Sequence, residues 1–377
     1  MLWPFAPRDA MTETLAWKTD VLRPYATEQR IRLSNAPRRT ISHDYLFTPA
    51  QAELAANIAR GELPGPFELP EWQEFSRFSA ASGAGSVAVD TTAGRYAVGG
   101  KALLWQDWNA CESLTISGVS DTTLSFAGTT SRAYGNAVIA PIGTGYLPSG
   151  LLTNPRAQTA YAAQAEWECF DVLDLGDDGS LIDSYQGEPL IAAARVGADS
   201  FRDRLLREVD AIDNEIARPV YDTARAQAFR STGVAWITTA AAERWALRVQ
   251  LHTLKGRSRA FWAPTWNNGI RLAADAVMGA TTITVVYAGL SLGSGTGDLF
   301  VKRADGSTLA LRYTAAVSGG STETLTLSTG LPSALAVASI QTFCRLLRVR
   351  LDSDRVELVH RAPRITSALV PAIEVPL

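Results

Sequence analysis

Histidine is the residue type in this sequence best suited to acid–base or metal chemistry, and its placement supports neither. His43, His252 and His360 each lack a second His or a Cys at the spacing that a metal site requires. His43 and Asp44 are neighbours, but adjacent side chains on a strand point to opposite faces. We therefore expect all three histidines to be structural residues that lie at the surface or half-buried.

An acidic segment from residue 174 to residue 183 (DLGDDGSLID) could supply oxygen ligands to a calcium ion. An EF-hand loop needs oxygen ligands at positions 1, 3 and 5, glycine at position 6 and glutamate at position 12. With Gly179 at position 6, two ligand positions fall on Gly176 and Tyr185, which do not fit them. The sequence therefore favours an ordinary acidic turn.

Glycine-rich segments occur at 82–86, 143–145 and 293–297. A phosphate-binding loop would need a following helix and a Lys-Ser/Thr ending, and neither is present, so we expect turns between strands. Nothing singles out one pair among the 38 acidic residues for glycoside hydrolysis. The sequence predicts no catalytic, cofactor-binding or metal-binding residue, and we expect the protein not to be an enzyme.

Composition indicates a folded chain with sizeable cores. Of 377 residues, 46% are hydrophobic and 19% are charged, and the net charge of −3 comes with no basic stripe that would indicate nucleic-acid binding. The cysteines Cys111, Cys169 and Cys344 lie far apart, which is typical of buried, inert thiols in a reducing compartment. The N-terminus lacks the pattern of a secretory signal, and no run of 18 apolar residues predicts a membrane span.

A pattern of aromatic residues and proline, F-x-x-P-x-W, occurs twice, 194 positions apart. Its members are Phe67, Pro70 and Trp72 in the first copy and Phe261, Pro264 and Trp266 in the second. An alanine-rich, helix-like stretch precedes each copy by about twenty residues. A repeat of this length predicts a duplicated fold unit in which these residues are core anchors.

Two further tryptophans are candidates for exposed contacts. Trp105 and Trp108 stand three apart in LLWQDW, and on a strand one member of such a pair must face outward. Exposed tryptophan rings could bind sugars.

Hydrophobic periodicity predicts mostly β structure with a few helices. Residues 12–47 alternate as strands do, whereas residues 49–60 fit a helix with Thr48 as N-cap and Gly61 as the stop. Short alternating runs separated by turn signals every eight to twelve residues then predict small all-β domains. A helix is also expected at 199–214, with Ser200 as its cap.

The predicted architecture is mostly β (α+β), with two similar antiparallel-sheet-plus-helix units in tandem, each interrupted by a small β-barrel or sandwich. The first unit comprises residues 1–77 and 146–175 with an insert at 78–145, a linker with a helix spans 176–218, and the second unit comprises 219–272 and 346–377 with an insert at 273–345.

Several short motifs resemble tail-tip proteins of long-tailed bacteriophages. They are W-K-T-D-V-L (17–22), E-Q-R-I-R-L (28–33), A-P-R-R (36–39), L-K-G-R-S-R-A-F-W-A-P-T-W (254–266) and the closing V-E-L…E-V-P (356–376). The last two are similar to elements of distal tail proteins as well. The chain differs from a single-copy distal tail protein by its two units and two inserts, so distal tail ring, minor tail protein and hub all stay open.

The resemblance implies a structural protein of the virion tail tip, assembled in the host cytoplasm. Its partners would be other copies of itself, as a trimer or hexamer with pseudo-symmetry, and the tail tube, hub and tape measure proteins. Arg30, Arg38 and Arg39 would lie near an interface, since the guanidinium group makes several hydrogen bonds at once. The alternatives are a receptor- or carbohydrate-binding module carried by the inserts, and a cell-wall hydrolase.

Overall fold

The structure, a computed structural model of the chain, describes residues 1–22, 28–91, 95–170, 175, 182–192, 204–207, 209–213, 215, 218–222, 228–292, 295–361 and 365–375. The fold is mostly β, as the sequence predicts, with two α-helices among the described residues. The acidic segment at 174–183 falls almost entirely outside the described residues.

The described residues of the first half of the chain, 1–170, form one α-helix, one 3₁₀ helix and thirteen strands. They are β1 (Met11–Ala16), β2 (Thr19–Leu22), β3 (Gln29–Arg32), β4 (Arg38–Phe47), α1 (Pro49–Glu62), β5 (Phe67–Pro70), η1 (Trp72–Glu74), β6 (Ser76–Ala80), β7 (Ser86–Ala88), β8 (Lys101–Asp107), β9 (Ala110–Ser120), β10 (Thr123–Phe126), β11 (Tyr134–Tyr146), β12 (Leu152–Ala157) and β13 (Ala160–Cys169).

The second half, residues 182–375, contains the other α-helix. Its described elements are β14 (Asp183–Tyr185), β15 (Glu188–Leu190), β16 (Arg204–Leu206), β17 (Asp210–Ile212), β18 (Val220–Asp222), β19 (Phe229–Thr238), α2 (Ala241–Leu254), η3 (Gly256–Ser258), β20 (Ala260–Pro264), β21 (Thr282–Val286), β22 (Gly297–Arg303), β23 (Thr308–Ser318), β24 (Thr322–Leu327), η4 (Val337–Ser339), β25 (Ile340–Leu351), β26 (Arg355–Arg361) and β27 (Ile365–Glu374).

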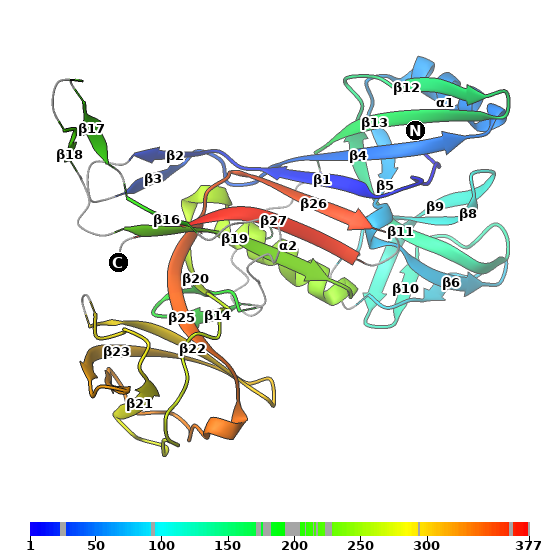
Figure 1. Cartoon of the computed structure of the whole chain (residues 1–377). Helices are drawn as coiled ribbons and strands as arrows, with labels where there is room; N and C mark the ends of the chain where they lie inside the picture. The colour runs from blue at the N-terminus through cyan, green and yellow to red at the C-terminus, as the bar shows by residue number, and fades with distance from the viewer. Residues whose placement is uncertain are drawn as a thin grey trace.

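One antiparallel array of eight strands runs through both halves and joins them (Figure 1). Neighbouring strands follow the order β16, β19, β27, β26, β1, β4, β13 and β12. β1 comes from the first half, yet it lies between β4 of that half and β26 of the second. Among the described pairings, β16 and β12 have a neighbour on one side only, and Figure 1 places them at opposite ends of the molecule.

β1 also contributes to the hydrophobic core of the second half. Leu15 of β1 and the following Trp17 are buried in a cluster with Trp236 of β19, Leu251 of α2 and Leu358 of β26. The first half has its own core, in which Trp3, Phe67 and Trp167 pack edge to face. The two halves are therefore held together by backbone hydrogen bonds and by shared apolar burial.

The helix predicted at 49–60 is present as α1, and its N-terminus is capped as expected. The Thr48 side chain accepts a hydrogen bond from the Gln51 amide, and the Gln51 side chain accepts one from the Thr48 amide. The expected stop at Gly61 is wrong, because the helix includes Gly61 and continues through Glu62. Pro64 ends it, since a proline restricts the preceding Leu63 to extended backbone.

Each half also carries a small β region with a core of its own. In the first, β6–β10 and the start of β11 surround a cluster that includes Phe78, Ile116 and Leu124. In the second, β21–β24 and the start of β25 surround a cluster that includes Val285 and Leu325. Figure 1 shows the second region as a separate lobe, with β25 running between the lobe and the rest of the chain.

The two halves share the order and the pairing of their strands. In each, a hairpin (β2–β3, β17–β18) precedes a ten-residue strand (β4, β19), a 14-residue helix and a short strand that pairs with the long strand leaving the insert. Phe67 lies opposite Gly145, and Phe261 lies opposite Val349. The pairs β9–β10 and β23–β24 even share a register shift, next to Phe126 in one half and Leu327 in the other.

The helix expected at 199–214 is wrong where the structure describes this segment. Residues 204–206 form β16 and residues 210–212 form β17. Its expected cap at Ser200 lies outside the described residues. The spacing of Leu205, Leu206, Val209 and Ile212 fits a helix face as well as it fits two short strands, and pairing with β19 and β18 decides for strands.

The glycine-rich segment at 143–145 is not a turn, because it lies inside β11. A Cβ atom on Gly145 would approach Leu69 Cδ2 to 3.0 Å and Trp167 Cε3 to 3.3 Å. Glycine at this position therefore allows close packing of β11 on its neighbours. Residues 82–85 do form the expected turn, with Gly83 at φ +81°.

Candidate functional site

The most highly charged buried site in the described structure lies where the two halves meet. At its centre is Glu13 of β1, which has no exposed surface. β1 lies between β4 and β26, and so its side chains reach residues of both halves. A carboxylate in such a position must be paired with cations and hydrogen bonded, since burying an uncompensated charge is very costly.

Three cationic or polar side chains bind the Glu13 carboxylate. Arg39 Nε of β4 donates to Oε1 at 2.5 Å, and Arg248 of α2 donates to both oxygens at 2.8 and 2.7 Å. His360 Nε2 of β26 lies 2.9 Å from Oε2, while its Nδ1 lies 2.8 Å from the Thr366 hydroxyl. Arg248 and His360 come from the second half, so the network links the halves.

The charge of Glu13 is stabilised by these partners. Burial raises the pKa of Glu13, but the guanidinium groups of Arg248 and Arg39 and the hydrogen bond with His360 lower it more. The net result is a pKa well below the usual range for glutamate, so Glu13 is a carboxylate at neutral pH.

A second pair of carboxylates extends the network along η1 and its entry. Glu71 accepts hydrogen bonds from Arg39 and Gln73, and Glu74 binds Arg244 of α2 at 3.1 and 3.2 Å. Glu74 and Arg244 are both almost fully buried. The short helix after the F-x-x-P element of the first half is thus held against the helix of the second half.

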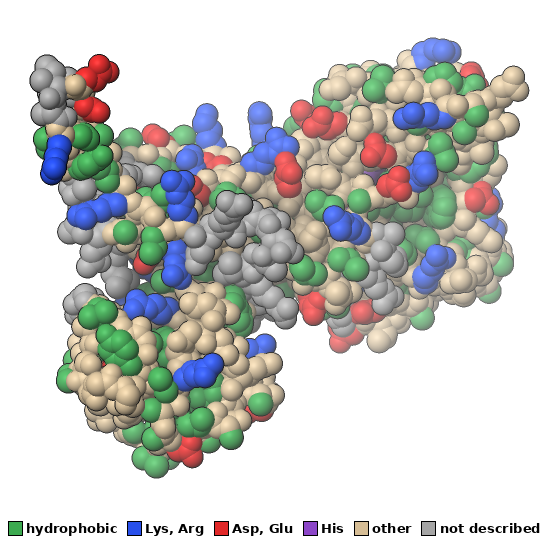
Figure 2. Space-filling view, in the orientation of Figure 1, with side chains coloured by type: hydrophobic (Ala, Val, Ile, Leu, Met, Phe, Trp, Pro, Cys, Tyr) green, Lys and Arg blue, Asp and Glu red, His purple; other side chains and the backbone are tan. Residues whose placement is uncertain are grey.

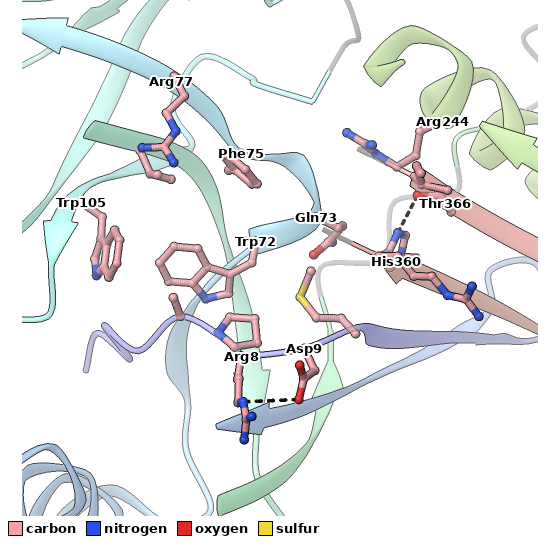
Figure 3. Close-up of a pocket in the computed structure, with 16 residues that line it drawn as sticks. Arg8, Asp9, Trp72, Gln73, Phe75, Arg77, Trp105, Arg244, His360 and Thr366 are labelled. Carbon is pink, nitrogen blue, oxygen red and sulfur yellow. Dashed lines mark hydrogen bonds and ion pairs between the residues drawn. The ribbon is translucent and has the colours of Figure 1, made fainter. Parts of the chain in front are cut away.

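A cavity of about 210 Å³ opens beside this network and is lined by both halves (Figure 3). Trp72 and Trp105 pack edge to face on one side of the cavity, with ring centroids 5.4 Å apart and ring planes at 82°. His360 and Arg244 lie on the other side, and Arg8 and Asp9 pair at its rim. The volume is below the roughly 300 Å³ at which small-molecule pockets begin.

The two tryptophans expected to make exposed contacts are both half-buried. Trp105 donates from Nε1 to the Pro4 carbonyl at 2.9 Å and packs on Trp72, whereas Trp108 packs against the core of the first half.

The repeat anchors lie at corresponding places in the two halves. Phe67 and Phe261 are 1% and 0% exposed, and Pro70 and Pro264 are buried beside them. Trp72 is buried against Trp105, while the half-buried Trp266 packs on Phe300 at 5.4 Å with Lys302 over its ring.

The three arginines expected near an interface have different surroundings. Arg39 lies in the Glu13 network between the halves. Arg30 of β3 lies near Glu28 at 3.6 Å, where burial and the nearby Arg348 and Arg350 outweigh Glu28 and lower its pKa. Arg38 is exposed.

The expectation that the histidines lie at the surface or half-buried is wrong, since His43, His252 and His360 are 0%, 2% and 4% exposed. His360 and Glu13 are the functional residues that sequence reasoning did not find. The only signal was a single acid within the otherwise uncharged strand MTETLA. It does not identify the partners, and two of them, Arg248 and His360, are 235 and 347 residues away along the chain.

The described part of the chain offers neither a cluster of metal-binding side chains nor a membrane-spanning helix. No group of three or more His, Cys, Asp or Glu side chains there could hold a metal ion. No helix there is long and apolar enough to cross a bilayer. Neither a scan of protein-family models nor a search of curated proteins returns a match to this chain.

Proposed function

We propose that this chain is a structural protein of the tail tip of a long-tailed bacteriophage, a distal tail, hub or minor tail protein. In this proposal, copies of it form a ring that joins the tail tube to the baseplate. The observation that carries the proposal is the eight-stranded array, in which two four-stranded sets with the same strand order are joined edge to edge through β1. Contacts of this head-to-tail kind generate rings when the rotation closes.

The matching strand order supports an internal duplication. Corresponding strands, helices and even a register shift recur in both halves. Two similar units per chain would give a ring of six units from three chains, or of twelve units from six.

The chemistry of the junction supports scaffolding rather than turnover. The Glu13 carboxylate is buried and saturated by Arg39, Arg248 and His360, so it is not accessible to a substrate. Buried ionic networks of this type contribute specificity of arrangement in several proteins. Here the network would fix the angle between the two units, on which ring closure depends.

Imaging of virions tests the proposal directly. Phage particles produced from the genome that encodes this chain are labelled with an antibody against it, and we expect the label at the tail tip. Particles whose tails never carry the label would contradict the proposal. Binding of the chain to host glycans without incorporation into the tail would instead favour the receptor-binding alternative.

A further inference from the structure

The two outer strands of the eight-stranded array correspond in position to β1 and β26, and the pairing of those two strands inside the chain is a template for a contact between the edges. The array consists of the set β16–β19–β27–β26 followed by the set β1–β4–β13–β12. Inside the chain, the first strand of one set (β1) pairs with the last strand of the other (β26). Among the described pairings, the two strands with a neighbour on one side only are again a first strand, β16, and a last strand, β12.

We propose that β16 of one copy pairs antiparallel with β12 of a second copy, so that the chain assembles head to tail by strand addition. This inference rests on the proposed function for its biological setting, but its geometry comes from the chain alone. Main-chain hydrogen bonds supply affinity in such contacts, and unpaired edges otherwise expose a row of amide and carbonyl groups.

The side chains at the two edges are exposed in the way that a missing partner would explain. Leu15 of β1 is fully buried in the neighbouring core, whereas Leu205, at the corresponding place in β16, is 69% exposed. On the receiving edge every residue of β12 is exposed, and Leu152 is 58% exposed. Leu151 and Ile58 of α1 are only partly buried and could receive the leucine.

The hairpins that follow β1 and β16 support the same contact. β2–β3 docks on the second half, where Arg257 donates to the Thr19 carbonyl at 2.9 Å and Arg350 binds Glu28 at 2.6 Å. β17–β18 has no such support in the described chain. Its Ile212, Val220 and Tyr221 are 58–65% exposed. Figure 2 shows this arm projecting from the body, and a second copy would give it a surface to dock on.

The template also gives the register. Thr14 lies opposite Thr40, the third residue of β4, and opposite Glu357 of β26. Arg204 lies opposite Ser231, the third residue of β19, and so corresponds to Thr14. Leu358 of β26 lies opposite Ala368, the fourth residue of β27. Thr153 of β12 lies opposite Ala163, the fourth residue of β13, and so Thr153 corresponds to Leu358. The residues that precede them, Leu152 and Glu357, therefore correspond as well. Arg204 is therefore expected opposite Leu152 of the second copy.

Disulfide trapping tests this register in the full chain. Two variants, Leu152→Cys and Arg204→Cys, are made in a Cys111→Ser background, because the other two cysteines are buried. Directly opposed residues have Cα atoms about 4.5–5.5 Å apart, which a disulfide can span. We expect a cross-linked dimer from the oxidised mixture and none from either variant alone.

A second pair of cysteine variants controls for cross-links that form by random collision of exposed cysteines. Val317 of β23 is 64% exposed, and Val317→Cys mixed with Arg204→Cys is expected to give no dimer. Equal cross-linking in both mixtures, or none in the first, would overturn the proposed contact.

Self-association is measured separately by sedimentation equilibrium. We expect Leu205→Asp to weaken it at least tenfold and Val317→Asp to leave it within twofold of the unmodified chain. An unmodified chain that stays monomeric at tens of micromolar, or equal effects of both variants, contradicts the inference. A chain that assembles and cross-links as expected but is absent from virion tails would contradict the proposed function alone.

Discussion

At the scale of single residues, the junction between the halves depends on one carboxylate with three partners. Glu13→Gln would remove the negative charge and leave Arg39 and Arg248 buried without full compensation. Breaking a buried ion pair on one side costs about 3–5 kcal/mol, and we expect a loss of that order in the free energy of unfolding, measured by urea denaturation.

The control for this substitution is Glu357→Gln. Glu357 pairs with Arg355 on β26, but both side chains are more than half exposed. Exposed ion pairs contribute between zero and about 1 kcal/mol, so the control variant should unfold close to the unmodified chain. Equal destabilisation by the two substitutions would show that the Glu13 network does not hold the halves together.

His43 gives the protein a pH dependence of known sign. Burial, with the nearby Arg39 and His360, lowers the pKa of His43 from 6.5 to about 3. Its Nε2 is buried without a hydrogen-bond partner among the described atoms, so a proton there would be unfavourable. The unfolded chain binds that proton below about pH 6.5 and the folded chain does not, so stability falls as the pH decreases from about 6.5 toward about 3.

The expected slope is up to about 1.4 kcal/mol per pH unit from this residue. Unfolding free energies measured by denaturant between pH 7 and pH 5 should therefore decline, and should decline less in His43→Gln. Above pH 5, the titration of Glu13 does not contribute to this slope. Because the pKa of Glu13 is lowered in the folded chain, its contribution to stability is lost only as the pH falls below the usual range for glutamate. An unchanged slope in the variant would mean that His43 takes up the proton while folded.

At the scale of secondary structure, the elements that could be predicted are those whose local signals agree. Thr48, Pro49 and Gln51 specify the start of α1 within one turn, and alternation of apolar residues identifies β4 and β13. The segment at 204–212 could not be predicted in this way. Its apolar residues have the spacing of a helix, and pairing with β19 and β18, which lie later in the chain, makes it two strands.

The buried site illustrates the same limit. The F-x-x-P-x-W pattern predicted core anchors, because aromatic residues at fixed spacing are visible in the sequence. All of its members are buried except Trp266, which is half-buried. The Glu13 network could not be located. Its members lie in β1, β4, α2 and β26, and contacts between segments so far apart in the sequence leave no local pattern. The array of eight strands is likewise assembled from pairs distant in sequence.

At the scale of the whole molecule, β1 makes the two halves one cooperative body, whereas the lobe formed by β21–β24 has a core of its own. The cluster around Leu15 contains residues of both halves, so damage to it should spread. The cluster around Leu325 contains only residues 270–343, so damage to it should stay local.

Leu325→Ala and Val356→Ala test this division, because both side chains are fully buried, one in each cluster. Cavity formation at Leu325 costs about 2–5 kcal/mol. We expect faster amide hydrogen exchange, followed by mass spectrometry, within 282–343 and unchanged exchange in β1, β4 and β26. Val356→Ala should instead accelerate exchange in β1 and α2 together. Exchange that rises throughout the chain for Leu325→Ala would show that the lobe is part of the same folding unit, and deleting it would then disrupt the edges β16 and β12 as well.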